Sequence, residues 1–125
     1  MSQPRTHRLQ DVRSLCYHLK VARLMEVDDS VLNKARDRVK GWLSGRLPFG
    51  GSREYMVEWD SALDASKEGI VKLLLEDSPR ARALRQTSPF LGVLGQLEWN
   101  NIVRTVTPDT LLEFEQVVKD ANRGI

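Results

Sequence analysis

Metal-binding chemistry is the first to consider, because this chain of 125 residues contains two histidines and one cysteine. His7, Cys16 and His18 do not form HExxH, CxxC or another recognised ligand spacing. Cys16 shares the apolar register of its helix with Leu15 and Leu19, so we expect a buried thiol that packs and does not react. The sequence therefore predicts no metal site and no cofactor.

Nucleophilic and acid–base catalysis are the next candidates. Ser88 lacks a GxSxG-like context and precedes a proline, which is typical of a turn or capping serine. Two carboxylate pairs, Glu54 with Glu58 and Asp60 with Asp64, have the spacing that places both groups on one helix face. General acid–base catalysis requires that one carboxyl group of a pair be desolvated, and nothing in the sequence indicates that any of these four side chains is buried. We interpret the pairs as a solvated acidic face and expect a protein that is not an enzyme.

The least ordinary segment spans residues 80–104, RARALRQTSPFLGVLGQLEWNNIVR. Pro89 disfavours helix at the residue before it, and apolar side chains follow in a connector that would normally be polar. Either the core of this small protein or another molecule must cover them. We favour a partner protein, with Phe90 and Leu91 filling a pocket in it while arginines pair with its acidic groups. The residues predicted to bind the partner are Arg82, Arg85, Gln86, Ser88, Phe90 and Leu91.

The large aromatic residues divide into two groups. Trp42, Trp59 and Trp99 lie on the apolar register of their helices, so we expect them in the core. Phe49 and Phe90 lie in loops beside prolines, where an aromatic side chain is better placed to anchor a partner.

The net charge of +2 hides an uneven distribution. Residues 1–53 hold 11 Lys/Arg against 5 Asp/Glu, whereas residues 54–125 hold 8 against 12. One interpretation is a basic face that contacts nucleic acid, and the other is solvated helix faces that neutralise each other in the fold. The nucleic-acid alternative is predicted to use Arg13, Lys20, Arg23, Lys34 and Arg38.

Apolar residues recur at spacings of three and four, and no alternating run indicates a strand. This pattern predicts an all-α fold, a compact bundle of five or six helices in a single domain covering residues 1–125. The first two helices, joined at residues 28–30, are expected to form an antiparallel hairpin. The expected helical stretches are 8–27, 30–45, 53–76 with an interruption near Ser66 and Gly69, 79–86, 96–106, and a last one beyond Thr107.

Breaks between these stretches have recognisable signals. Ser78 and Pro79 supply an N-cap and a proline at the first helical position. Three glycines and one proline in residues 45–52 predict a connector. We expect residues 1–7 to fray and residues 122–125 to form the C-terminal end.

Location follows from what is missing in the sequence. No apolar run approaches the roughly 20 residues needed to cross a bilayer, and the first residues lack the apolar stretch of a signal peptide. A lone cysteine cannot form an intramolecular disulfide. We expect a cytoplasmic protein without membrane contact.

The segment RALRQTSPFLGVL, followed by Leu97, Glu98 and Trp99, resembles a group of small bacterial helical proteins that carry an RQ[ST]SPFxGVL segment. The resemblance covers roughly residues 9–104, and the tail after Thr107 departs from it. It implies an antitoxin-like protein whose partner is a toxin, and it leaves a homodimer open. The matching residues are Arg85, Gln86, Ser88, Pro89, Phe90, Gly92, Val93, Leu94 and Trp99.

Overall fold

The computed structural model describes residues 5–45 and 53–123, with Arg5 and Thr6 described by their backbone alone. The all-α class is confirmed for these residues, which form seven helices and no strand. Expectations for residues 1–4, 46–52 and 124–125, including Phe49, lie outside the described residues. The helices are α1 (Arg5–Val27), α2 (Ser30–Ser44), α3 (Arg53–Leu63), α4 (Lys67–Leu75), α5 (Pro79–Gln86), α6 (Gln96–Thr105) and α7 (Leu111–Arg123).

Serine side chains begin α4 and α5, as the sequence indicates. Ser66 Oγ accepts a hydrogen bond from the Gly69 amide at 3.1 Å, so the chain that leaves α3 starts a new helix. Ser78 Oγ likewise accepts from the Ala81 amide at 3.2 Å, with Pro79 in the first turn of α5. Because residues 53–76 divide into two helices, the described residues contain seven helices where five or six were expected.

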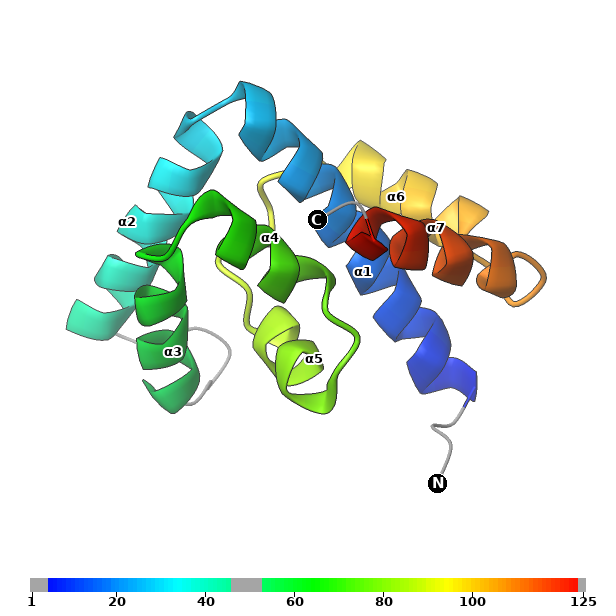
Figure 1. The fold of residues 1–125 in the computed structure, drawn as a ribbon, viewed down its shortest axis with the longest axis horizontal. Helices are drawn as coiled ribbons and strands as arrows, with labels where there is room; N and C mark the ends of the chain where they lie inside the picture. The colour runs from blue at the N-terminus through cyan, green and yellow to red at the C-terminus, as the bar shows by residue number, and fades with distance from the viewer. Residues whose placement is uncertain (1–4, 46–52, 124–125) are drawn as a thin grey trace.

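The first helix, α1, is the central element of the fold. Helices α2, α4, α6 and α7 pack against it, and α3 packs mainly against α2. Figure 1 shows α2 and α3 at one end of the molecule and α6 and α7 at the other. The antiparallel hairpin of the first two helices stays a prediction, because the packing partner that α2 contacts most is α3.

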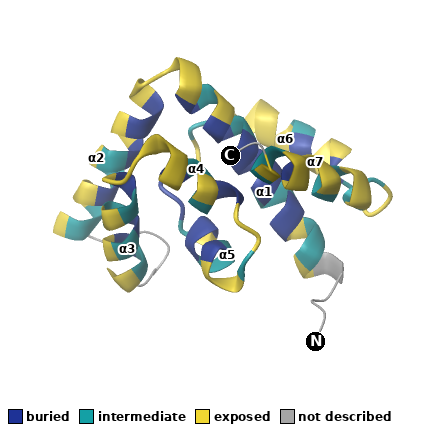
Figure 2. Ribbon diagram, in the orientation of Figure 1, coloured by how far each residue is buried: buried dark blue, intermediate teal, exposed yellow. Residues whose placement is uncertain are grey.

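Burial is least complete on the two C-terminal helices. The only fully buried residue within α6 is Ile102 and within α7 is Val118, and Figure 2 shows these helices mostly as exposed and half-buried ribbon. Leu97, Val103 and Leu112 are exposed apolar side chains on them. No helix in the described ranges is both long enough and apolar enough to pass through a membrane.

Side chains of neighbouring helices bond the last carbonyl groups of several helices. The final turn of a helix leaves carbonyl oxygens without a partner in that helix, so donors from elsewhere stabilise the end and tie two helices together. The donors and their acceptors are Arg13 to Val103 of α6 and to Val106, the residue that caps α6, Arg36 to Leu63 of α3, Trp59 to Leu84 of α5, and Asn122 to Leu75 of α4.

A buried carboxylate joins α1 to α5. The side chain of Asp11 is 2% exposed and lies among three guanidinium groups. Arg8 and Arg82 approach one of its oxygens at 3.1 and 3.2 Å, and Arg85 approaches the other at 3.3 Å. A buried charge needs paired charges around it, so the position of α5 on α1 depends on Asp11.

Arg8 extends this ionic network to the chain's C-terminal helix. Its guanidinium pairs with Asp77 at 3.1 Å and with Glu115 of α7 at 3.1 Å. The hydrogen bond from Arg8 lowers the pKa of Asp77 below its usual value, although partial burial opposes this shift. Three arginines therefore face three carboxylates, and the network is electrically balanced.

Replacing Asp11 tests this arrangement. Asp11→Asn keeps the side-chain shape but leaves three guanidinium groups facing one another, so we expect the free energy of unfolding to fall by about 3 kcal/mol. Asp77→Asn is the matched control, because the Asp77 side chain is 38% exposed and such pairs contribute about 1 kcal/mol or less. Urea denaturation measures both, and equal small losses would contradict the central role of Asp11.

Candidate functional site

The apolar connector, residues 87–95 between α5 and α6, lies partly inside the protein. Phe90 is 0% exposed and packs edge to face against Trp59, with ring centroids 6.1 Å apart. Figure 2 shows the start of the connector as buried and half-buried ribbon. The prediction that Phe90 inserts into a partner was therefore wrong, because a side chain without exposed surface cannot reach another protein. Leu91 is half-buried and still reaches the surface.

The phenol of Tyr17 bonds three backbone groups of the connector. Its hydroxyl donates to the Phe90 carbonyl at 3.0 Å and accepts from the amides of Gly92 at 3.0 Å and Leu94 at 3.1 Å. A phenol has one proton and two lone pairs, so its bonding capacity is fully used. The φ of +86° at Gly92 favours glycine at this turn.

The next residue of α1, His18, holds the start of the connector. Its Nδ1 donates to the Ser14 carbonyl at 2.8 Å, which leaves Nε2 to accept from the Ser88 hydroxyl at 2.9 Å. Ser88 Oγ in turn accepts from the Phe90 amide at 3.1 Å. Burial lowers the pKa of His18 from 6.5 to about 4, although its bond to Ser14 opposes the shift.

This serine–histidine pair is a structural contact. His18 is 0% exposed and Ser88 is buried, so no substrate reaches the hydroxyl in this conformation. Of the two predicted roles, turn or capping serine, the bond from the Phe90 amide two residues on supports the turn. Ser88 is therefore removed from the predicted partner-binding residues.

Arg38 of α2 also bonds the connector. Its Nη1 donates to the Pro89 carbonyl at 3.0 Å and also to the Leu91 carbonyl. Buried or half-buried backbone groups need such partners. Tyr17, His18 and Arg38 together fix the course of the connector.

One flank of the connector borders a shallow hollow, which we call the Tyr17–Trp99 groove. Its volume is about 370 Å³. Tyr17 and Trp99 meet edge to face at 6.1 Å, and Trp99, expected in the core, is 37% exposed. A Cβ added to Gly92 or Gly95 would meet no atom within 4 Å, so the space beside both glycines is open. The lining residues are Tyr17, Leu91, Gly92, Leu94, Gly95, Gln96 and Trp99.

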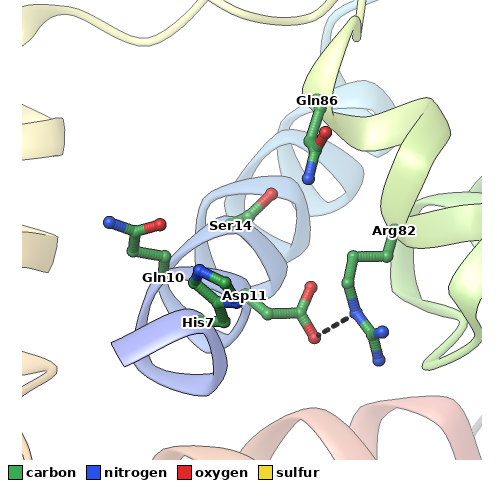
Figure 3. Close-up of a pocket in the computed structure, with 6 residues that line it drawn as sticks. All are labelled: His7, Gln10, Asp11, Ser14, Arg82 and Gln86. Carbon is green, nitrogen blue, oxygen red and sulfur yellow. Dashed lines mark ion pairs between the residues drawn. The ribbon is translucent and has the colours of Figure 1, made fainter. Parts of the chain in front are cut away.

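Arg82 and Arg85 of α5 bond other residues of this protein. Arg85 is 1% exposed and donates to Asp11 and to the Glu76 carbonyl, so its predicted pairing with a partner was wrong. Arg82 is half-buried and pairs with Asp11, as the dashed line in Figure 3 marks. Gln86 is exposed. Of the residues predicted to bind a partner, Arg82, Gln86 and Leu91 therefore still have exposed surface.

Arg82 and Gln86 border a polar pocket of about 280 Å³ between α1 and α5, drawn in Figure 3. Its one carboxylate, Asp11, is already neutralised by arginines, so the pocket has no excess charge with which to hold an ion. No three His, Cys, Asp or Glu residues of the described ranges converge as a metal site requires. The remaining lining residues are His7, Gln10 and Ser14.

The basic residues predicted for nucleic acid do not share one role. Arg13 bonds the end of α6, Arg38 bonds the connector, and Lys20 pairs with Glu98 at 2.8 Å. Arg23 and Lys34 are exposed and make no ion pair with any described residue. Three of the five side chains therefore have contacts within the fold.

Sequence reasoning missed Tyr17, Gly95 and the position of Arg38 at the connector. A usable signal was present at Tyr17 and His18, two polar-tipped residues next to each other within the most apolar part of α1. Buried polar atoms require hydrogen-bond partners, and an apolar connector offers unpaired backbone groups. No comparable local signal marks Gly95, since its role depends on the open space around it.

The lowered pKa of His18 predicts a loss of stability in mild acid. The unfolded chain binds the proton with the ordinary pKa of 6.5, whereas the folded protein resists it down to about 4. The stability that neutral His18 contributes is thus fully present above pH 6.5 and is lost as the pH falls from 6.5 toward 4. Between pH 7 and pH 5 we expect the free energy of unfolding to fall by about 2 kcal/mol.

Urea denaturation of wild type and His18→Gln at both pH values measures this effect. The variant lacks the buried imidazole but keeps exposed His7, so its stability should change much less. A wild-type stability that stays constant, or an equal decrease in the variant, would show that His18 is not the group responsible.

Comparison with protein-family models, characterised proteins and solved structures finds no match for this chain. Its function therefore has to be inferred from its own groove, charges and buried contacts. Of these, the Tyr17–Trp99 groove is the feature that combines open space, an exposed aromatic ring and a fixed backbone.

Proposed function

We propose that this protein is a non-catalytic protein-binding module and that the Tyr17–Trp99 groove receives its partner. The observation that supports this most is the open space beside Gly92 and Gly95, bordered by a tryptophan that is 37% exposed. Tryptophan and tyrosine supply much of the binding energy at protein interfaces, where they pair with side chains inserted into pockets.

The hydrogen bonds below the groove favour binding because they fix its shape. A loop that is ordered before binding loses less conformational entropy when the partner arrives. The connector has that order, since Tyr17 bonds Phe90, Gly92 and Leu94. In this proposal Phe90 is a buried support, and Leu91 is the connector side chain that contacts the partner.

The class of partner is inferred from the resemblance to small bacterial antitoxin-like proteins. Leu91, Gly92 and Leu94 belong to the segment that carries this resemblance, and they line the groove. We therefore propose an antitoxin-type component that binds and neutralises a toxin protein in the cytoplasm. A second copy of this chain is the competing occupant.

A nucleic-acid-binding regulator has less support. Binding to phosphates needs several cations that are free to displace counterions. Of the predicted set, Lys20 is neutralised by Glu98, and Arg13 and Arg38 each give part of their guanidinium group to backbone carbonyls. Among the described residues, this leaves Arg23 and Lys34 as the members of the set that are wholly free for phosphate. Retention on DNA that falls steeply with salt would favour this alternative.

Filling the groove tests the proposed function. Gly95 has φ −68° and ψ 169°, a conformation open to any residue, so Gly95→Trp places a ring in the open space with little strain. Gly95→Ala is the matched control, because both variants change the same helix cap. Each tagged protein is purified from its native host, and its stoichiometric companions are quantified by mass spectrometry.

We expect wild type and Gly95→Ala to retain the same companion protein and Gly95→Trp to lose it by at least tenfold. Trp99→Ala should weaken binding of the purified companion by about 30-fold, the size of a hot-spot truncation. Circular dichroism checks that all variants are folded. A companion retained equally by Gly95→Trp, or none retained by wild type, would overturn the proposal.

A further inference from the structure

Positive charge predominates around the Tyr17–Trp99 groove. Arg13 and Lys20 flank Tyr17 on α1 at one turn to either side, and Arg38 bonds the carbonyl of Leu91, a lining residue. The acidic residue next to Trp99 is Glu98, which already pairs with Lys20 at 2.8 Å. Three cationic side chains and one carboxylate therefore contact or adjoin residues that line the groove, although none of the four lines it directly.

Arg38 keeps donors for a partner. It uses Nη1 for the connector carbonyls, while Nε and Nη2 make no bond to any described residue. Arg38 is half-buried, so its side chain still reaches the surface. No carboxylate within the described ranges pairs with Arg38, and its charge is therefore not neutralised by an acid.

Arg13 of α1 is held in a similar way, by carbonyl groups at the C-terminal end of α6. Its Nε and Nη2 donate to the carbonyls of Val106 and Val103, two turns and one turn beyond Trp99, at 2.9 and 3.2 Å. Both arginines thus bond neutral carbonyl groups in place of carboxylates. An arginine that is already oriented loses less freedom when it binds an anion, and its planar group matches a carboxylate.

We propose that the segment that fills the groove is acidic, with one large apolar side chain packed against Trp99 beside Gly92 and Gly95, and with Asp or Glu residues that bind Arg38 and Arg13. This inference rests on the proposed function and names the chemistry of the partner. A neutral or basic segment would leave the arginine charges uncompensated or oppose them. A nucleic-acid strand fits less well, because the lining between the cations is largely apolar.

Selection from random 12-residue peptides displayed on phage tests the inference. The library is selected on immobilised wild type and counter-selected on Gly95→Trp, so that the surviving peptides need the open groove. We expect them to share one aromatic or aliphatic anchor flanked by Asp or Glu. A synthetic peptide from this set should bind Arg38→Gln about tenfold more weakly than wild type, and its Asn/Gln analogue should bind wild type about tenfold more weakly.

Lys20→Gln provides a second variant, because its ion pair is exposed and its loss should leave the fold intact. Removal of Lys20 frees Glu98, so acidic peptides should again bind more weakly. Surviving peptides that are neutral or basic would overturn the acidic-partner inference and leave the groove as a binding site. If no selected peptide distinguishes wild type from Gly95→Trp, both the groove as a binding site and the acidic-partner inference are overturned.

Discussion

The structure depends on a constraint at residues 88–94, where a chain segment without regular structure lies partly in the interior. Its amides and carbonyls lose water there and need other partners. Tyr17 bonds three of these residues, His18 orients Ser88, and Arg38 bonds two further carbonyl oxygens. Because these side chains come from α1 and α2, the connector is fixed to both helices, and Phe90 packs against Trp59.

Five of the arginines follow a related logic and divide into two groups. Those of the ionic network, Arg8, Arg82 and Arg85, face carboxylates and lie in a balanced cluster. Arg13 and Arg38 bond carbonyl oxygens near the groove. The first group holds α1, α5 and α7 together, whereas the second keeps its positive charge at the surface. The same residue type therefore serves stability in one place and recognition, as we propose, in another.

Local patterns predicted the features that depend on neighbouring residues. The helical class, the cap at Ser78 and the burial of Cys16 follow from spacing and propensity; burial also raises the pKa of this thiol to about 11. The burial of Phe90 and Arg85 could not be predicted from local patterns. Arg85 is buried because Asp11, 74 positions earlier, receives its guanidinium, and Phe90 is buried because Tyr17 and Trp59 converge on it. A loop position alone favours exposure.

Hydrogen exchange at the amides of Gly92 and Leu94, followed by NMR in wild type and Tyr17→Phe, tests most directly whether Tyr17 fixes the connector. If it does, both amides exchange at least 100-fold more slowly than an exposed loop in wild type, since they are released only when the connector opens. In Tyr17→Phe their protection should be lost, while the amides of α3 keep theirs. Rapid exchange in wild type, or protection that the substitution leaves unchanged, would contradict a connector held by this phenol.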